Sequence, residues 1–234
     1  MPGWIDQIAG AGAIFLVMGS GVLTMARGNP EHVADIVPVD LAVNNLLVSV
    51  AAKAKQVPVP RPFIVHGGTS DPRQNPLRWR SSIRVVVDYF RKYPPAERVS
   101  MSKFNMIPSK EEFKTQWLLS YVFPSVAMST LGKALADEQL IRQAERLRSI
   151  SRRAKSLVKC LGPFGEREWI FHADSNDVLA SLLKSNDEEW WVDAKDIDWE
   201  RYILNYCVGL KKYMLNEDVS TEDHRLSTLA VSRL

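Results

Sequence analysis

The stretch Ala34–Asn44, which reads ADIVPVDLAVN, decides the expected fold of the first half of the chain. Residues 33–39 form an apolar run that predicts a short buried strand, and Pro38 stands at its end, where a missing amide donor is tolerated. Asp40 is then a suitable N-cap for a helix over residues 41–52. This helix is apolar on nearly all sides, so we expect it to be buried against a sheet.

The segments around this stretch continue the pattern of an α/β domain. Before it, a glycine-rich loop predicts a short helix at residues 14–27. After it, residues 63–66 predict a second strand, ended by two glycines, and residues 83–90 have the apolar spacing of a helix. Strands alternating with helices are typical of an α/β sheet.

The second half of the chain has helical periodicity instead. An irregular, polar segment over residues 96–114 predicts a domain boundary. Beyond it, an apolar helix pair is broken by Pro124, and a long amphipathic helix ends at Gly162 and Pro163. Asp198 is expected to cap the last helix. The long helix is predicted over residues 137–159. The other predictions for this half are a short extended piece over 169–171, a short helix over 177–183 and a loose tail from 216.

An aromatic cluster occurs in this half of the chain. Its members need polar partners for their N–H and O–H groups, and Asp and Asn are plentiful nearby. We therefore expect the cluster to form a small helical core rather than a site. The members are Trp169, Phe171, Trp190, Trp191, Trp199, Tyr202 and Tyr206.

Composition places the 234-residue chain among ordinary globular proteins, with 24% charged and 46% hydrophobic residues. The net charge of +3 does not indicate nucleic acid binding. Cys160 and Cys207 lie far apart and predict two reduced thiols. The sequence contains no run of about 18 apolar residues, the length that a membrane-spanning helix needs. The apolar N-terminal segment has no basic leader, so no signal peptide is expected.

The residue patterns of catalysis are absent from the sequence. Gly10 and Gly12 match two positions of a dinucleotide fingerprint, but no strand precedes them and Phe15 stands where the third glycine belongs. No tyrosine has a lysine four residues later, the pair that short-chain reductases use for proton donation. The histidines and cysteines are too far apart for a zinc site.

The long helix carries a run of basic residues with three open interpretations. A solvated face is the simplest. An anionic membrane surface is the second, because the preceding Trp117–Leu135 segment is apolar enough to lie at an interface. The third is an acidic cofactor such as coenzyme A, held through its phosphates. The residues are Arg142, Arg146, Arg148, Arg152, Arg153, Lys155 and Lys159.

Motifs at both ends of the chain resemble fatty acyl-CoA reductases of the alcohol-forming kind. Pro2–Asp6, Gly19–Leu23 and Asp35–Asn44 resemble the end of the reductase domain, although Gln7 and Ser20 depart from the family pattern. Residues 115–215 resemble the helical C-terminal domain, sometimes called the male-sterility domain. The matching residues there are Trp117, Leu118, Leu119, Arg167, Glu168, Trp169, Phe171, Asn176, Asp193, Ile197, Asp198, Trp199, Tyr202, Gly209, Lys212, Tyr213, Met214 and Leu215.

The resemblance implies a fold with two parts. Residues 1–100 would be the α/β remnant of a Rossmann-type, extended short-chain reductase domain. Residues 110–216 would be an all-α domain, and residues 217–234 a flexible tail. Pro38, Val39 and Asp40 would lie near the acyl substrate, because open α/β sheets place ligands at the carboxyl ends of their strands.

The resemblance also implies an activity, the NADPH-dependent reduction of long-chain fatty acyl-CoA to fatty alcohol and free coenzyme A. The family's nucleotide loop and Tyr-x-x-x-Lys pair have no match here. No catalytic, cofactor-binding or metal-binding residue is therefore assigned, and the chain is expected to be a truncated reductase that lacks the catalytic half.

Two rival hypotheses and a location complete the expectations. The rivals are a non-catalytic protein that binds acyl-CoA or a membrane surface, and a helical interaction module with no lipid role. Ser232-Arg233-Leu234 fits the Ser-basic-Leu form of a peroxisomal address, so a peroxisome is the expected location. The endoplasmic reticulum and the cytoplasm are the alternatives, and the sequence does not indicate an oligomeric state.

Overall fold

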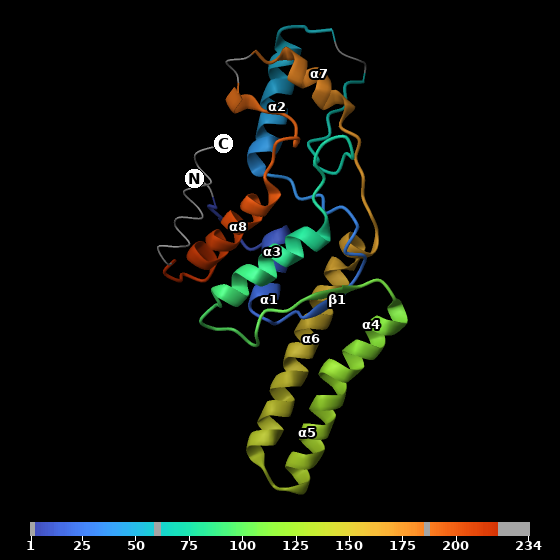
Figure 1. Cartoon of the computed structure of the whole chain (residues 1–234), viewed down its shortest axis with the longest axis vertical. Coiled ribbons are helices and arrows are strands. Elements are labelled where there is room, and N and C mark those ends of the chain that lie inside the picture. The colour runs from blue at the N-terminus through green and yellow to red at the C-terminus, as the bar shows by residue number, and fades with distance from the viewer. Residues whose placement is uncertain (1–2, 59–61, 185–187, 220–234) are drawn as a thin grey trace.

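The computed structural model describes residues 3–58, 62–184 and 188–219, and it shows an elongated molecule built mostly of helices (Figure 1). In chain order the elements are α1 Gly10–Gly19, β1 Met25–Arg27, α2 Val39–Ala54, α3 Trp79–Lys92, β2 Asn105–Ile107, α4 Lys110–Trp117, a π-helical turn Leu118–Val122, α5 Phe123–Ala134, α6 Glu138–Glu166, α7 Asp174–Leu182, a 3-10 turn Glu188–Trp190, α8 Trp199–Gly209 and a π-helical turn Leu210–Met214.

Among the described residues, the sheet is reduced to two short parallel strands. β1 pairs with β2 so that Met25 lies beside Asn105 and Arg27 beside Ile107. These strands lie 80 positions apart in the sequence, and α2 and α3 occur between them. The fold is therefore mainly helical, which agrees with the expected helical C-terminal domain.

The main core is formed where α1, α3 and α8 meet in the middle of the molecule (Figure 1). Phe15 from α1, Phe90 from α3 and Ile203 from α8 are almost fully buried there. The last long helix described in the chain thus completes a core whose other two helices come from the first hundred residues.

Two smaller cores lie on either side of the main one. In the upper part of Figure 1, α2 packs on α7 through Val48 and Leu179. Below the main core, α5 and α6 project as an antiparallel pair of helices. Tyr121 is buried with Met25 and Ile107 at the base of this pair.

The predicted strands at 33–39 and 63–66 are not formed. Val33 makes an isolated bridge to Arg78, and the backbone after it is satisfied by other partners. The Ala34 amide donates to the Leu77 carbonyl at 2.7 Å, and the Ile36 carbonyl accepts from the Thr69 hydroxyl at 3.1 Å. Apolar runs of this length can be extended without joining a ladder, which explains the wrong prediction.

The predicted helix over 14–27 is also wrong in its extent. α1 ends at Gly19, and Gly21 has φ of +70°, a conformation that favours glycine and turns the chain. A Cβ atom on Gly21 would lie 2.4 Å from the Ser100 carbonyl oxygen. The turn allows β1 to begin at Met25.

α2 exists as predicted but begins earlier and is not buried on all sides. Pro38 occupies the N-cap, so Asp40 lies in the first helical turn and accepts a hydrogen bond from the Leu41 amide at 3.1 Å. The helix packs on α7 rather than on a sheet. Its outer stripe is exposed and comprises Val39, Val43, Leu46, Leu47 and Val50.

Prolines interrupt the helices of the second half less than predicted. α4, the π-helical turn and α5 follow one another without a break, and the turn ends directly before α5, in which Pro124 is the second residue. The π-helical turn directly before Pro124 is the local irregularity that accommodates a residue with no amide hydrogen to donate. α6 continues through Pro163 to Glu166 instead of ending before it.

Other helices agree with the sequence. α3 spans the predicted 83–90 segment, and α7 overlaps the predicted 177–183 segment. The Asp198 carboxylate accepts a hydrogen bond from the Arg201 amide at 3.1 Å and caps α8, as expected. Residues 169–171 have no regular structure, so the extended piece predicted there forms no strand.

Candidate functional site

Segments from the two ends of the chain meet in a junction of three loops, formed by residues 33–40, 66–74 and 167–174. The Glu168 carboxylate accepts a hydrogen bond from the Val33 amide at 2.9 Å, across 135 positions of sequence. The Ser70 hydroxyl accepts one from the Phe171 amide at 3.0 Å. The two sequence motifs that suggested a reductase therefore lie side by side.

The first two loops are joined by Asp35. Its carboxylate accepts hydrogen bonds from the Thr69 amide at 2.7 Å and from the Thr69 hydroxyl at 3.2 Å. A Cβ atom at Gly68 would lie 3.3 Å from the same carboxylate, so the absence of a side chain allows the close approach. This bonding holds the chain in position as it enters α2.

The second and third loops are joined by Asp71, whose side chain is fully buried. Its carboxylate accepts hydrogen bonds from the Ala173 amide at 2.7 Å and from the Arg73 guanidinium at 2.6 and 3.0 Å. Arg73 also contacts Asp174 at 2.7 Å. The Arg73 hydrogen bond outweighs the cost of burial and holds the pKa of Asp71 well below its usual range.

The predicted substrate-proximal residues lie where the first loop enters α2. Pro38 is buried, whereas Asp40 is exposed and Val39 is 78% exposed. Asp40 lies near Tyr202 of α8. Burial first, and then the charges of Tyr206 and Asp40, raise the pKa of Tyr202. The described contacts do not test whether Pro38, Val39 and Asp40 touch a substrate, so this role stays a prediction.

The aromatic cluster is divided between core and surface. Trp199 is buried, and Tyr206 packs edge-on against Phe15 with ring centroids 5.7 Å apart. Trp169, Phe171 and Trp190 are instead 37–44% exposed, so their expected place in a core is wrong. Trp169 and Phe171 follow the end of α6, and Trp190 belongs to a single 3-10 turn, so a helical stripe does not continue at any of the three.

The glycine-rich segment is part of α1. Gly12 lies under Tyr206, and a Cβ atom there would come within 2.8 Å of the tyrosine oxygen. Burial raises the pKa of Tyr206, while a hydrogen bond from the Gly12 backbone acts against this rise. The segment thus forms a helix that packs on α8, so the glycine-rich loop expected before residue 14 is wrong from Gly10 onward.

The hydrogen bonds of the junction hold its three loops in position. No group of three or more His, Cys, Asp or Glu residues that could hold a metal ion occurs within the described ranges. Cys207 is buried, which raises the pKa of its thiol and keeps it protonated. Cys160 and Cys207 are free, as expected.

Sequence reasoning missed the residues that hold the junction together. Ser70, Asp71 and Arg73 were passed over as part of a loop. The run Gly67–Asp71, two glycines followed by three side chains that can accept hydrogen bonds from a backbone, was the available signal.

Comparison with known proteins gives this arrangement a context. Residues 117–217 match the family model described as male sterility protein. The chain resembles fatty acyl-CoA reductases over almost its entire length. It is 30% identical over 224 residues to fatty acyl-CoA reductase 1 of Mus musculus and of Homo sapiens, and 28% identical over 222 residues to human fatty acyl-CoA reductase 2. These findings confirm the resemblance predicted from the sequence.

The similarity covers 94% of this chain but only 41% of each of these reductases. Several residues that match the sequence pattern of the reductase family stabilise the fold of this chain. The buried Asn176 donates to the Val192 carbonyl at 2.9 Å. At Gly209, a Cβ atom would lie 1.8 Å from the Gly3 carbonyl oxygen, so a side chain there would clash with the backbone.

Proposed function

We propose that this chain is part of an alcohol-forming fatty acyl-CoA reductase. Such an enzyme reduces a long-chain fatty acyl-CoA to a fatty alcohol and releases coenzyme A. The observation that supports this best is the similarity to fatty acyl-CoA reductases over 94% of the chain, which includes the motifs on both sides of the junction.

The proposal assigns residues 1–100 to the end of a Rossmann-type domain. β1, α2 and α3 lie within this range, and β1 pairs in parallel with β2, which follows just beyond it at Asn105–Ile107. This order of strand, helices and strand supports the assignment, because parallel strands need a crossover connection. Residues 110–216 would be the helical domain. Residues 217–234 would be a tail, of which residues 220–234 lie outside the described ranges. Pro38, Val39 and Asp40 would face the acyl substrate at the edge of the first part.

NADPH would be held and used by residues outside this chain. The sequence has neither the complete glycine fingerprint nor a tyrosine with a lysine four residues later. The described part of the chain would instead position the substrate through the junction loops. The purified chain alone should therefore neither bind NADPH nor oxidise it in the presence of palmitoyl-CoA.

The test is the complete reading frame of the transcript. We expect upstream codons for a glycine fingerprint after a strand and for a Tyr-x-x-x-Lys pair. Expressed in yeast, that frame should produce fatty alcohol, measured by gas chromatography, whereas its Tyr→Phe variant should not. A frame that starts at Met1 would contradict the proposal.

In that case, a non-catalytic protein that binds acyl-CoA becomes the better candidate. Isothermal titration of the purified chain with palmitoyl-CoA separates it from a helical module with no lipid role. Binding would favour the first, and its absence would favour the second.

We also propose a peroxisomal location, supported by the terminal Ser232-Arg233-Leu234, which lies outside the described residues. A fluorescent protein fused before Met1 should appear in peroxisomes, and deletion of Leu234 should release it to the cytoplasm. A reticular pattern would favour the endoplasmic reticulum instead.

A further inference from the structure

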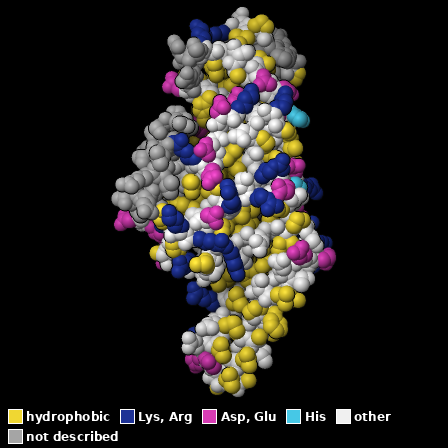
Figure 2. Space-filling model, in the orientation of Figure 1, with side chains coloured by type: hydrophobic (Ala, Val, Ile, Leu, Met, Phe, Trp, Pro, Cys, Tyr) yellow, Lys and Arg dark blue, Asp and Glu magenta, His cyan; other side chains and the backbone are white. Residues whose placement is uncertain are grey.

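The α5–α6 hairpin, which we define as residues 118–159, exposes apolar side chains along one arm. Figure 2 shows hydrophobic side chains over much of this projecting end of the molecule. Large apolar residues on a free surface commonly mark an interaction site. The exposed ones, each 39–68% accessible, are Leu118, Leu119, Val122, Phe123, Val126, Leu131 and Leu135.

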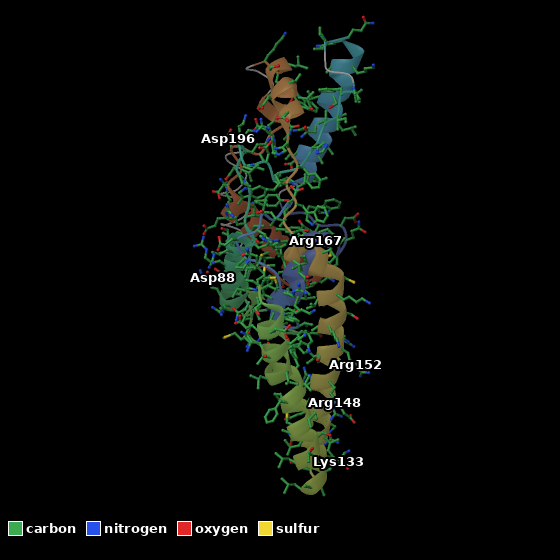
Figure 3. All side chains as sticks on the ribbon, turned by 90° about the vertical axis from the view of Figure 1, so that its right-hand side faces the viewer. Asp88, Lys133, Arg148, Arg152, Arg167 and Asp196 are labelled. Carbon is green, nitrogen blue, oxygen red and sulfur yellow. The ribbon has the colours of Figure 1, made fainter. Side chains whose placement is uncertain are left out.

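The other arm of the hairpin is basic, whereas the tip carries Lys133 beside Asp137 and Glu138. Residues 118–159 contain eight lysines and arginines but three acidic residues, a net charge of +5 in a chain whose total is +3. Lys133, Arg148 and Arg152 lie along the hairpin (Figure 3). None of these three forms an ion pair with another residue of the described ranges.

The apolar and basic residues share one side of the hairpin. A shallow groove of about 680 Å³ runs between the arms. Val122 and Val126 line it from one arm, and Glu145, Arg148 and Arg152 line it from the other, so the arginines outnumber the one acidic residue. Apolar side chains next to unpaired arginines match the surface of an anionic bilayer, where phosphate groups lie above acyl chains.

The hairpin is anchored firmly to the rest of the molecule. The Tyr121 hydroxyl is hydrogen bonded to the Thr24 hydroxyl at 2.8 Å, and Arg27 pairs with Glu166 at 3.0 Å. These contacts attach both arms to β1 and its flanks. The hairpin can therefore bring the whole molecule to a surface.

We propose that this face of the hairpin docks on the surface of a membrane containing anionic phospholipids. Leu119 and Phe123 would enter the headgroup region, while Arg148 and Arg152 would contact lipid phosphates. No helix of the described residues is long and apolar enough to cross a membrane. The hairpin would lie on the surface without spanning it. The proposal does not depend on the reductase activity.

The experiment measures sedimentation of the full chain with sucrose-loaded vesicles. Phosphatidylcholine vesicles with phosphatidylserine are compared with phosphatidylcholine alone. We expect binding to the anionic vesicles that weakens as salt is added. Arg148→Ser with Arg152→Ser should lower the partition coefficient about 30-fold, because each basic residue near an anionic surface contributes about fivefold. Leu119→Ser with Phe123→Ser should lower it at least about tenfold.

Matched controls are available on α2. Leu46→Ser with Val50→Ser removes two apolar side chains that are 64% and 58% exposed. Lys53→Ser with Lys55→Ser removes two exposed charges. Both control pairs should leave vesicle binding unchanged, and circular dichroism should show that all four variants are folded.

Several results would overturn the proposal. One is that the wild-type chain does not bind anionic vesicles. A second is that the hairpin variants and the α2 variants lose vesicle binding to the same extent. A third is the absence of vesicle binding together with a dimer in analytical ultracentrifugation that the Leu119→Ser, Phe123→Ser variant dissociates. The face would then join two copies of the chain. Binding of free coenzyme A to the arginine pair without vesicle binding would also overturn it.

Discussion

At the scale of single residues, hydrogen bonds from backbone amides to acidic side chains replace the missing strand ladders. Asp35, Asp71 and Glu168 each accept hydrogen bonds from the backbone of another loop. A carboxylate that accepts such bonds is strongly held, and its loss leaves buried amides without a partner. The junction therefore depends on a few acidic residues rather than on apolar packing.

Replacing Asp71 with asparagine should lower the free energy of unfolding at pH 7. Asparagine keeps one acceptor oxygen, but its NH2 group cannot accept the hydrogen bonds that the other Asp71 oxygen receives from the Arg73 side chain and amide. The charge that attracts Arg73 is also lost, and the expected loss is about 1–3 kcal/mol. The pKa of Asp71 is lowered in the folded chain. Its contribution is thus complete above the unfolded carboxyl pKa of about 4 and declines as the pH falls below that value.

Urea denaturation at pH 7 and at pH 3 measures this difference. The gap between wild type and Asp71→Asn should be smaller at pH 3. Asp88→Asn is the control, because Asp88 is exposed on α3 and pairs with no other described residue. A gap that is independent of pH would contradict the assigned role of the Asp71 charge.

The motifs that form this site could be identified from the sequence, but the contacts between them could not. The Asp35–Asn44 and Arg167–Phe171 motifs were identified from the residues themselves. Their meeting depends on side chain to backbone hydrogen bonds across more than a hundred positions, for example between Glu168 and Val33. Such bonds have no periodicity, so no local pattern reports them.

At the scale of the elements, helices were more predictable than strands. α3 and α8 have apolar positions three and four residues apart, and α8 also has the capping residue Asp198 at its start, which a helix explains. The runs 33–39 and 63–66 are short, and a short apolar run fits a strand and an unpaired extended loop equally well. The observed strands have three residues each, too few for any pattern.

The N-cap of α8 provides a test at this scale. Asp198→Ala removes the carboxylate that accepts from the Arg201 amide, and the expected loss is about 1 kcal/mol of unfolding free energy. Thermal or urea denaturation measures it. Asp196→Ala is the matched control, since no hydrogen bond of Asp196 occurs among the described residues. Equal effects of the two changes would argue against the cap.

At the scale of the whole molecule, the two expected parts of the chain share one core. Ile203 of α8 is fully buried among side chains of α1 and α3. Arg84 and Glu200 add a surface ion pair between α3 and α8 at 3.2 Å. This packing could not be predicted, because the sequence gives the apolar stripe of each helix but not its partner.

Ile203→Ala should therefore destabilise the molecule well beyond α8. Removing a fully buried isoleucine side chain costs about 2–5 kcal/mol. Near- and far-ultraviolet circular dichroism should report one shared transition at a lower urea concentration. Leu131→Ala on the hairpin, where the side chain is 55% exposed, should change the stability by no more than about 0.5 kcal/mol.

The position of α8 in this core also affects how the protein is made. Arg84 and Glu200 are separated by 116 residues, so α1 and α3 leave the ribosome long before their partner helix is synthesised. At about 5–20 residues per second, that interval lasts roughly 6–23 seconds. During it, Phe15 and Phe90 lack one side of their final environment. Until α8 emerges, the nascent chain exposes apolar surface of the kind that chaperones bind.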